Sequence, residues 1–152
     1  MATTTATFIA YDTFKRDKIN GAIDVDGDTF ICGLSTSTYT PARATHETIS
    51  DITNELSGNG YSRQTLASVA LSEPATGTWM FDSADPVFTA SGGSLVARWY
   101  WIFDDTPSSP LDPLCWYGLL DATPADVTVT DGNTLTLEVN VSGWWRYSGE
   151  ET

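Results

Sequence analysis

His46 is the single histidine among the 152 residues of this sequence, and so its one imidazole that could act as a general acid or base. Hydrolysis by a serine or cysteine nucleophile needs such a base beside the nucleophile and a carboxylate to orient it. No motif pairs His46 with a nucleophile, although a carboxylate distant in sequence could orient its ring. Because catalytic sites need several converging groups, we predict no catalytic residue and a non-enzymatic protein. A hydrolase that uses His46 with an acidic partner is the alternative.

Asp24, Asp26 and Asp28 form the one arrangement that resembles a metal-binding loop. Alternate aspartates open an EF-hand loop, where they give oxygen ligands to calcium, but the sixth position of that loop must be glycine. Thr29 occupies the sixth position here. We therefore interpret the three aspartates as an acidic turn that leads into a strand, with a looser calcium site as the alternative, and we expect no cofactor.

The two cysteines, Cys32 and Cys115, lie in separate apolar runs. With one histidine they cannot supply a CxxC-type zinc site. Each is expected to be a buried free thiol, with a disulfide as the alternative. The neighbours Asp104 and Asp105 could suggest glycoside hydrolysis, which requires two carboxyl groups held at a fixed separation. Adjacent residues do not specify that geometry, so we interpret them as solvated turn residues.

Aromatic residues make up 12% of the chain, and six of them are tryptophans. Rows of exposed rings can bind sugars or single-stranded bases by stacking. Bases are excluded by the charge, since 20 acidic against 7 basic residues give a net −13 that repels phosphate, and no direct nucleic-acid binding is expected. A carbohydrate-binding module is an alternative, whereas core packing or a protein interface is the favoured interpretation. The candidate interface residues are Phe8, Tyr11, Phe14, Trp144, Trp145 and Tyr147.

The elements that must position these groups include two short predicted helices. Residues 7–20 show aromatic residues at a spacing of three and end at an Asn-Gly pair. The basic residues of this segment, Lys15, Arg16 and Lys18, are interpreted as its polar face. Residues 46–56 are predicted to form the second helix, capped by Thr45. Its apolar face would consist of Ile49, Ile52 and Leu56.

Most of the remaining sequence alternates short apolar runs with Gly, Pro and Asp turns, which predicts a mainly β chain. We expect one β-sandwich or jelly-roll-like domain over residues 1–152. The run 95–103 is apolar on both faces, so one face should fill the core and the other should meet a second sheet, a helix or another subunit. The expected strands are 28–34, 65–71, 95–103, 114–120 and 135–141, with 127–129 as hairpin partner of the last.

No run approaches the roughly 18 apolar residues that a membrane-spanning helix needs. The first ten residues also lack the basic residues and the apolar core of a signal peptide. Synthesis in the cytoplasm and no membrane partner are therefore expected.

The order of motifs in the first half of the chain carries a resemblance to a known family. IDVDGDTFICGL at 23–34 is followed by TYTP at 38–41, then by His46, and then by DITNELSGNGY at 51–61. This order resembles a widespread family of small virion structural proteins of tailed phages, over Phe8 to Leu71. The sequence departs from the family pattern after Tyr61, where Ser-Arg-Gln replaces the usual glycine-rich ending.

The resemblance implies a capsid decoration (cement) protein, with tail or fibre positions as alternatives. It carries no catalytic residues to transfer. The implied partners are the major capsid protein or other virion proteins, and a homo-oligomer, with a trimer favoured, is expected. The protein would then be made in the bacterial host cytoplasm and reside in the virion.

Overall fold

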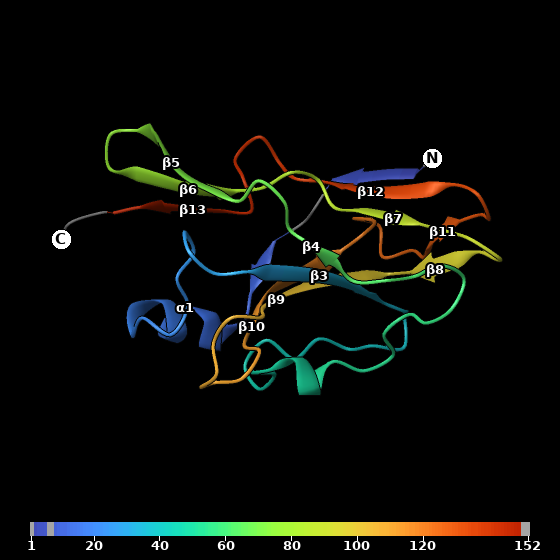
Figure 1. The fold of residues 1–152 in the computed structure, drawn as a ribbon, viewed down its shortest axis with the longest axis horizontal. Coiled ribbons are helices and arrows are strands. Elements are labelled where there is room, and N and C mark those ends of the chain that lie inside the picture. Colours follow the sequence, from blue (N-terminus) through green and yellow to red (C-terminus); the bar gives the residue numbers. More distant parts are fainter. Residues whose placement is uncertain (1, 6–7, 150–152) are drawn as a thin grey trace.

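Two layers of β-strands stack face to face in the computed structural model, which describes residues 2–5 and 8–149 (Figure 1). The mainly β, sandwich-like fold predicted from the sequence is confirmed. The lower layer in Figure 1 is an antiparallel five-stranded sheet in the order β2-β10-β9-β3-β4. Its strands are β2 (Ile9–Ala10), β3 (Phe30–Ser35), β4 (Gln64–Thr65), β9 (Trp99–Asp104) and β10 (Leu114–Leu119).

The upper layer consists of two three-stranded sheets that lie end to end (Figure 1). One has the order β1-β12-β7, in which β1 (Ala2–Thr5) runs parallel to β12 (Thr134–Glu138) and β7 (Val87–Thr89) is antiparallel. The other is antiparallel in the order β13-β6-β5. Its strands are β5 (Ala70–Ala75), β6 (Thr78–Asp82) and β13 (Trp145–Ser148), and a separate ribbon pairs β8 (Leu95–Ala97) with β11 (Val127–Val129).

The main hydrophobic core lies between the two layers, with the fully buried Trp116 of β10 at its centre. The Trp116 ring centroid lies 5.5 Å from that of Phe14, 5.6 Å from that of Phe81 and 5.8 Å from that of Trp144. Phe14 belongs to helix α1 (Asp12–Ile19), and Phe81 belongs to β6. One indole therefore ties α1, the lower sheet and the β13-β6-β5 sheet together.

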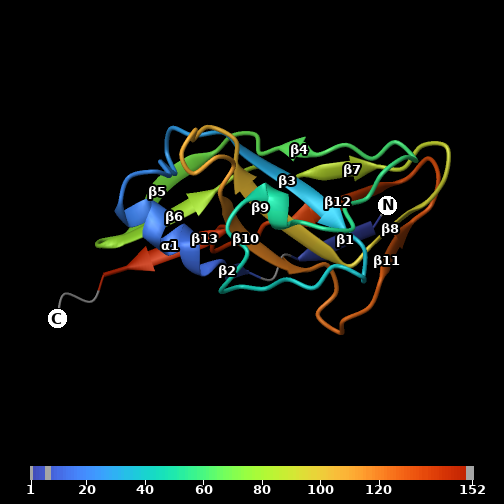
Figure 2. The same cartoon turned by 90° about the horizontal axis from the view of Figure 1, so that it is seen from below.

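A second cluster fills the outer face of the five-stranded sheet. Trp101 and Phe103 of β9 pack there with Tyr39, under the segment 36–56 and its 3-10 turn η1 (Ile49–Asp51) (Figure 2). Both faces of β9 are thus apolar, as the sequence predicts. The second face is covered by a loop of the same chain, rather than by a second sheet, a helix or another subunit.

The first predicted helix exists but is shorter than 7–20, because Ile9 and Ala10 pair with β10 before α1 begins. Thr7 lies outside the described residues. The helix predicted over 46–56 is wrong, since only η1 forms there. The Asp51 carboxylate accepts the backbone N–H groups of Glu47 and Thr48 and closes a single turn. Leu56 then donates its N–H to the Leu34 carbonyl of β3, so the backbone bonds to the sheet instead of continuing a helix.

The run 95–103 is two strands rather than one, because the ladder breaks at Arg98. The Arg98 backbone bonds to Ser35 and Leu120. A continuous strand would place Leu95 and Ala97 on the same face as Trp101, and the break shifts this alternation. Leu95 and Ala97 consequently face the same core as Tyr100 and Ile102.

The predicted hairpin of 127–129 with 135–141 is also wrong. Residues 127–129 pair with β8, and β12 lies between β1 and β7. Leu135 and Leu137 are buried as the alternation predicts, but the strand ends at Glu138 and Val141 is 93% exposed. The expected strand 65–71 is likewise divided between β4 and β5.

Candidate functional site

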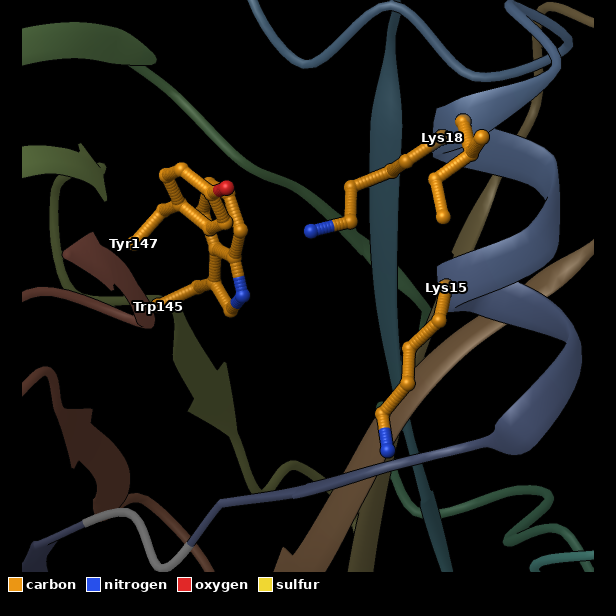
Figure 3. Close-up of a pocket in the computed structure, with 5 residues that line it drawn as sticks. Lys15, Lys18, Trp145 and Tyr147 are labelled. Atoms are coloured by element: carbon orange, nitrogen blue, oxygen red, sulfur yellow. The ribbon is translucent and has the colours of Figure 1, made fainter. Parts of the chain in front are cut away.

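An open groove of about 560 Å³ lies between α1 and β13 (Figure 3). Lys15, Lys18 and Ile19 of the helix line one side, and Trp145 and Tyr147 of the strand line the other. The groove combines apolar walls with two ammonium groups. Its place is at the end of the molecule where α1 lies beneath β6 and β13 (Figure 1).

Local periodicity explains why these side chains meet on the helix side. Phe14 and Asp17 are buried beneath α1. Positions three and four apart share a face of a helix, so Lys15, Lys18 and Ile19 follow one another along the rim of the groove. Ile19 is 88% exposed and has no apolar cover of its own.

On the strand side, the apolar face of the sheet continues past the core. Trp145 is paired with the buried Phe81, and Tyr147 is paired with Trp79. Directly opposed residues of antiparallel strands point to the same side, so the four rings lie in two rows on one face. Trp79 is 43% exposed and Tyr147 is 56% exposed. This face thus begins inside the core and emerges from it as an uncovered aromatic surface.

Lys18 spans the groove towards the strand (Figure 3). Its Nζ lies 3.2 Å from the ring centroid of Trp145 and 4.7 Å from that of Phe14. Burial of the amine lowers the pKa of Lys18 to about 8. The ring faces attract the ammonium and act in the opposite direction, which makes Lys18 a partly desolvated cation held against an aromatic wall.

The cations without an anionic partner, among the described residues, gather at this end of the molecule. Of the seven basic residues, four form ion pairs: Arg16 with Asp17, Arg43 with Asp12, Arg63 with Glu55 and Arg98 with Asp126. The other three are Lys15 and Lys18 on α1 and Arg146 on β13. In a chain with a net charge of −13, these three described cations without a carboxylate partner thus lie on neighbouring elements at one end of the molecule.

We predict that Lys18 titrates well below the ordinary lysine pKa of about 10.4. Trp145→Ala is expected to raise the pKa of Lys18 towards that value, because water then reaches the amine. Lys15 and Lys18 are the two lysines of the chain, so reductive methylation with ¹³C-formaldehyde labels few amines and their signals can be followed against pH. Tyr147→Ala, which leaves the Trp145 ring in place, is the control. An ordinary Lys18 pKa in the parent chain would contradict the packing of its amine against Trp145.

His46 lies outside the groove, in the segment 36–56, where its ring ends a chain of hydrogen bonds through two tyrosines. The Tyr11 and Tyr39 hydroxyl groups are 2.9 Å apart, and the Tyr39 hydroxyl is 3.0 Å from Nδ1 of His46. The Ala42 N–H also points at Nδ1, at 3.5 Å, which favours Nδ1 as the acceptor of the Tyr39 proton. Burial raises the pKa of Tyr39 to about 12. This Tyr-Tyr-His hydrogen-bond chain ties the segment to Tyr11, at the start of α1.

The three aspartates predicted as an acidic turn do form one. The Asp24 carboxylate accepts the Asp26 N–H at 3.1 Å, and the Asp28 carboxylate accepts the Asp24 N–H at 2.7 Å. The carboxylates of Asp24 and Asp28 thus bond within the turn. Within residues 8–149, no three acidic, histidine or cysteine side chains are grouped so as to hold a metal ion. Cys32 and Cys115 are free and buried, as expected.

Asp104 differs from its prediction as a solvated turn residue, because it is fully buried at the end of β9. Its Oδ1 accepts the Thr106 N–H at 3.0 Å, and its Oδ2 is buried. Burial, reinforced by the nearby Asp28 carboxyl, raises the pKa of Asp104 to about 8. Asp105 is exposed, as expected.

The six candidate interface residues divide into two groups. Tyr11, Phe14 and Trp144 are core residues of the chain itself, so they have no surface to offer a partner. Phe8 is 38% exposed, and Tyr147 and the half-buried Trp145 line the groove. Sequence reasoning missed Lys15, Lys18, Ile19 and Trp79, although two lysines at helical spacing and two aromatic residues at strand spacing are visible in the sequence.

Comparisons with known proteins found no match to this chain among family models, curated proteins or solved structures. Among the described residues, no helix has the length and apolar character needed to cross a membrane.

Proposed function

We propose that this chain is a non-enzymatic structural protein of a tailed-phage virion, a capsid decoration protein that binds the assembled shell as an oligomer. The order of motifs over residues 23–61 supports the virion role. The observation that carries the docking role is the aromatic surface of the β13-β6-β5 sheet, which extends uncovered from the core beside two lysines that have no ion-pair partner among the described residues.

An open apolar surface of this kind suits adhesion. Interfaces draw most of their energy from a few aromatic and basic anchors near their centre. Trp79 and Tyr147 are such anchors because they are large, exposed and paired across two hydrogen-bonded strands. A repetitive shell would present the same complementary site many times, and the major capsid protein is the partner that we propose. A tail or fibre protein is the alternative partner within the virion.

Particle sedimentation tests this proposal. The parent chain is expected to co-sediment with assembled virions, and Trp79→Ala/Tyr147→Ala is expected to weaken that association at least tenfold because two anchors are removed. Val96→Ala is the matched control, since Val96 is also about 42% exposed but lies on β8 at the opposite end of the molecule (Figure 1). Recovery of the parent chain as a free protein in the presence of particles would overturn the proposal. Tailless particles distinguish shell from tail.

A carbohydrate-binding module is the second candidate, favoured by one observation. The rings of Trp145 and Tyr147 stack 6.1 Å apart with their planes 26° from parallel, and both line the groove. Neighbouring rings with similar orientation provide the kind of platform on which sugars stack. Titration with a broad glycan panel would change tryptophan fluorescence if this candidate is right.

A further inference from the structure

The groove combines an apolar wall with both lysines of the chain. Every arginine that forms an ion pair lies outside its lining, whereas both lysines of the chain belong to it. Neither lysine has a carboxylate partner among the described residues. The apolar walls of the groove are the Trp145 indole, the Tyr147 phenol and the exposed Ile19 side chain.

We propose that the groove between α1 and β13 binds an acidic protein segment, in which an apolar side chain packs on Trp145 and Tyr147 while flanking carboxylates pair with Lys15 and Lys18. The inference rests on the proposed function, for which it names the chemistry of the segment that the partner presents.

Charge complementarity selects the anionic part of this segment. The Lys18 ammonium is partly desolvated against Trp145, and a carboxylate entering the groove would supply the counter-charge that no described residue provides. The Lys15 ammonium extends from the same helix one turn earlier (Figure 3). Two cations on one rim favour a ligand with at least two carboxylates, and a neutral sugar would leave both unpaired.

The aromatic wall selects the apolar part. The face that carries Trp145 and Tyr147 is an extension of the core-facing surface of Phe81, so an apolar side chain placed there would extend the packing of the core. Phosphate-rich polymers are disfavoured by the −13 charge of the whole chain. A peptide that carries both carboxylates and an apolar side chain can pair with the lysines and pack on the aromatic wall at the same time.

Peptide titration of the intact isolated chain tests the inference. The probe is acetyl-Glu-Glu-Leu-Glu-Glu-amide, and the comparison peptides replace all four glutamates with glutamine or the leucine with serine. We expect the probe to bind at least tenfold more tightly than either comparison peptide, with an affinity that falls as salt rises. Lys15→Gln/Lys18→Gln and Tyr147→Ser should each weaken binding at least tenfold. Thermal unfolding of each variant confirms that it is folded.

Arg146→Gln is the matched control, because Arg146 lies between Trp145 and Tyr147 in sequence but faces the other side of β13, where its Nη2 contacts the sulfur of Met80 at 3.8 Å. This variant removes one positive charge, as each of the two lysine substitutions does, and should keep full affinity. A loss equal to that of the lysine variant would show that net charge rather than the groove governs binding, and would overturn the inference. Equal binding of the glutamine peptide would overturn it as well.

The outcome separates the inference from the proposed function. A chain that co-sediments with virions but does not bind the probe defeats the inference alone. A chain that binds the probe through the lysines but never associates with particles defeats the virion proposal alone. If the chain dimerises and the dimer shields both lysines from methylation, the groove is an interface between copies and the inference is wrong.

Discussion

Gly33→Ala is expected to destabilise this protein by about 3 kcal/mol, a large loss for the addition of one methyl group. Gly33 lies in β3 opposite Trp101 of β9. A Cβ built on Gly33 would come within 2.1 Å of Cη2 of the Trp101 ring, which lies over the glycine backbone. The ring cannot move away easily, because Trp101 is fully buried and its Nε1–H donates to Oγ of Ser35 at 2.9 Å.

Chemical denaturation of the two proteins measures this loss. Gly149→Ala is the control, because a Cβ there meets Tyr147 only at ordinary contact distances. The double variant Gly33→Ala/Trp101→Leu tests the cause, since a smaller side chain makes room for the methyl group. We expect its destabilisation to be less than the sum of the two single effects. Additive effects would mean that the two residues are not in contact, and that the β3–β9 register is wrong.

Asp104→Asn is expected to raise the free energy of unfolding by about 2 kcal/mol at pH 8, because it removes a carboxyl group that is costly to ionise in the core. The pKa of Asp104 is about 8 in the folded chain, against about 3.9 in an unfolded one. Between these values the folded state holds a proton that the unfolded state has lost. The contribution of Asp104 to the free energy of unfolding of the parent protein is therefore largest below about pH 4. It decreases as the pH rises to about 8.

The Asp104→Asn protein should lose this part of the pH dependence, so its advantage over the parent should grow from pH 4 to pH 8. Thermal unfolding at several pH values measures the difference. Asp105→Asn is the control, because it makes the same chemical change at the exposed neighbouring position. An advantage that is the same at pH 4 and at pH 8 would contradict the raised pKa of Asp104.

Secondary-structure patterns that depend on neighbours in sequence were predicted well. The strands at 30–35 and 114–119, the helix around Phe14 and the buried alternation of Leu135 and Leu137 all follow from local periodicity. The turn of Asp24, Asp26 and Asp28 was also predicted, since short-range side-chain to backbone bonds form it. The virion role and its partners remain predictions.

Patterns that depend on distant partners were not predicted. Residues 46–56 have helical spacing of apolar residues, but bonds to β3 and to the loop before β10 compete successfully with helix formation. The single strand expected over residues 95–103 is divided in two, because a break at Arg98, bonded to Ser35 and Leu120, shifts the alternation of side chains. Of the candidate interface residues, only exposure in the folded chain could separate Tyr147 from Trp144.

The sequence by itself determined that this protein is acidic, rich in strands and aromatic residues, and equipped with two lysines three residues apart. Those properties depend only on residue type and local spacing. Only the tertiary structure decided that Lys15 and Lys18 meet Trp145 and Tyr147, because about 130 residues of chain separate them and the register of β13 on β6 brings them together. The physical reason is that a groove is made by two surfaces, and each surface alone has the pattern of an ordinary helix or strand.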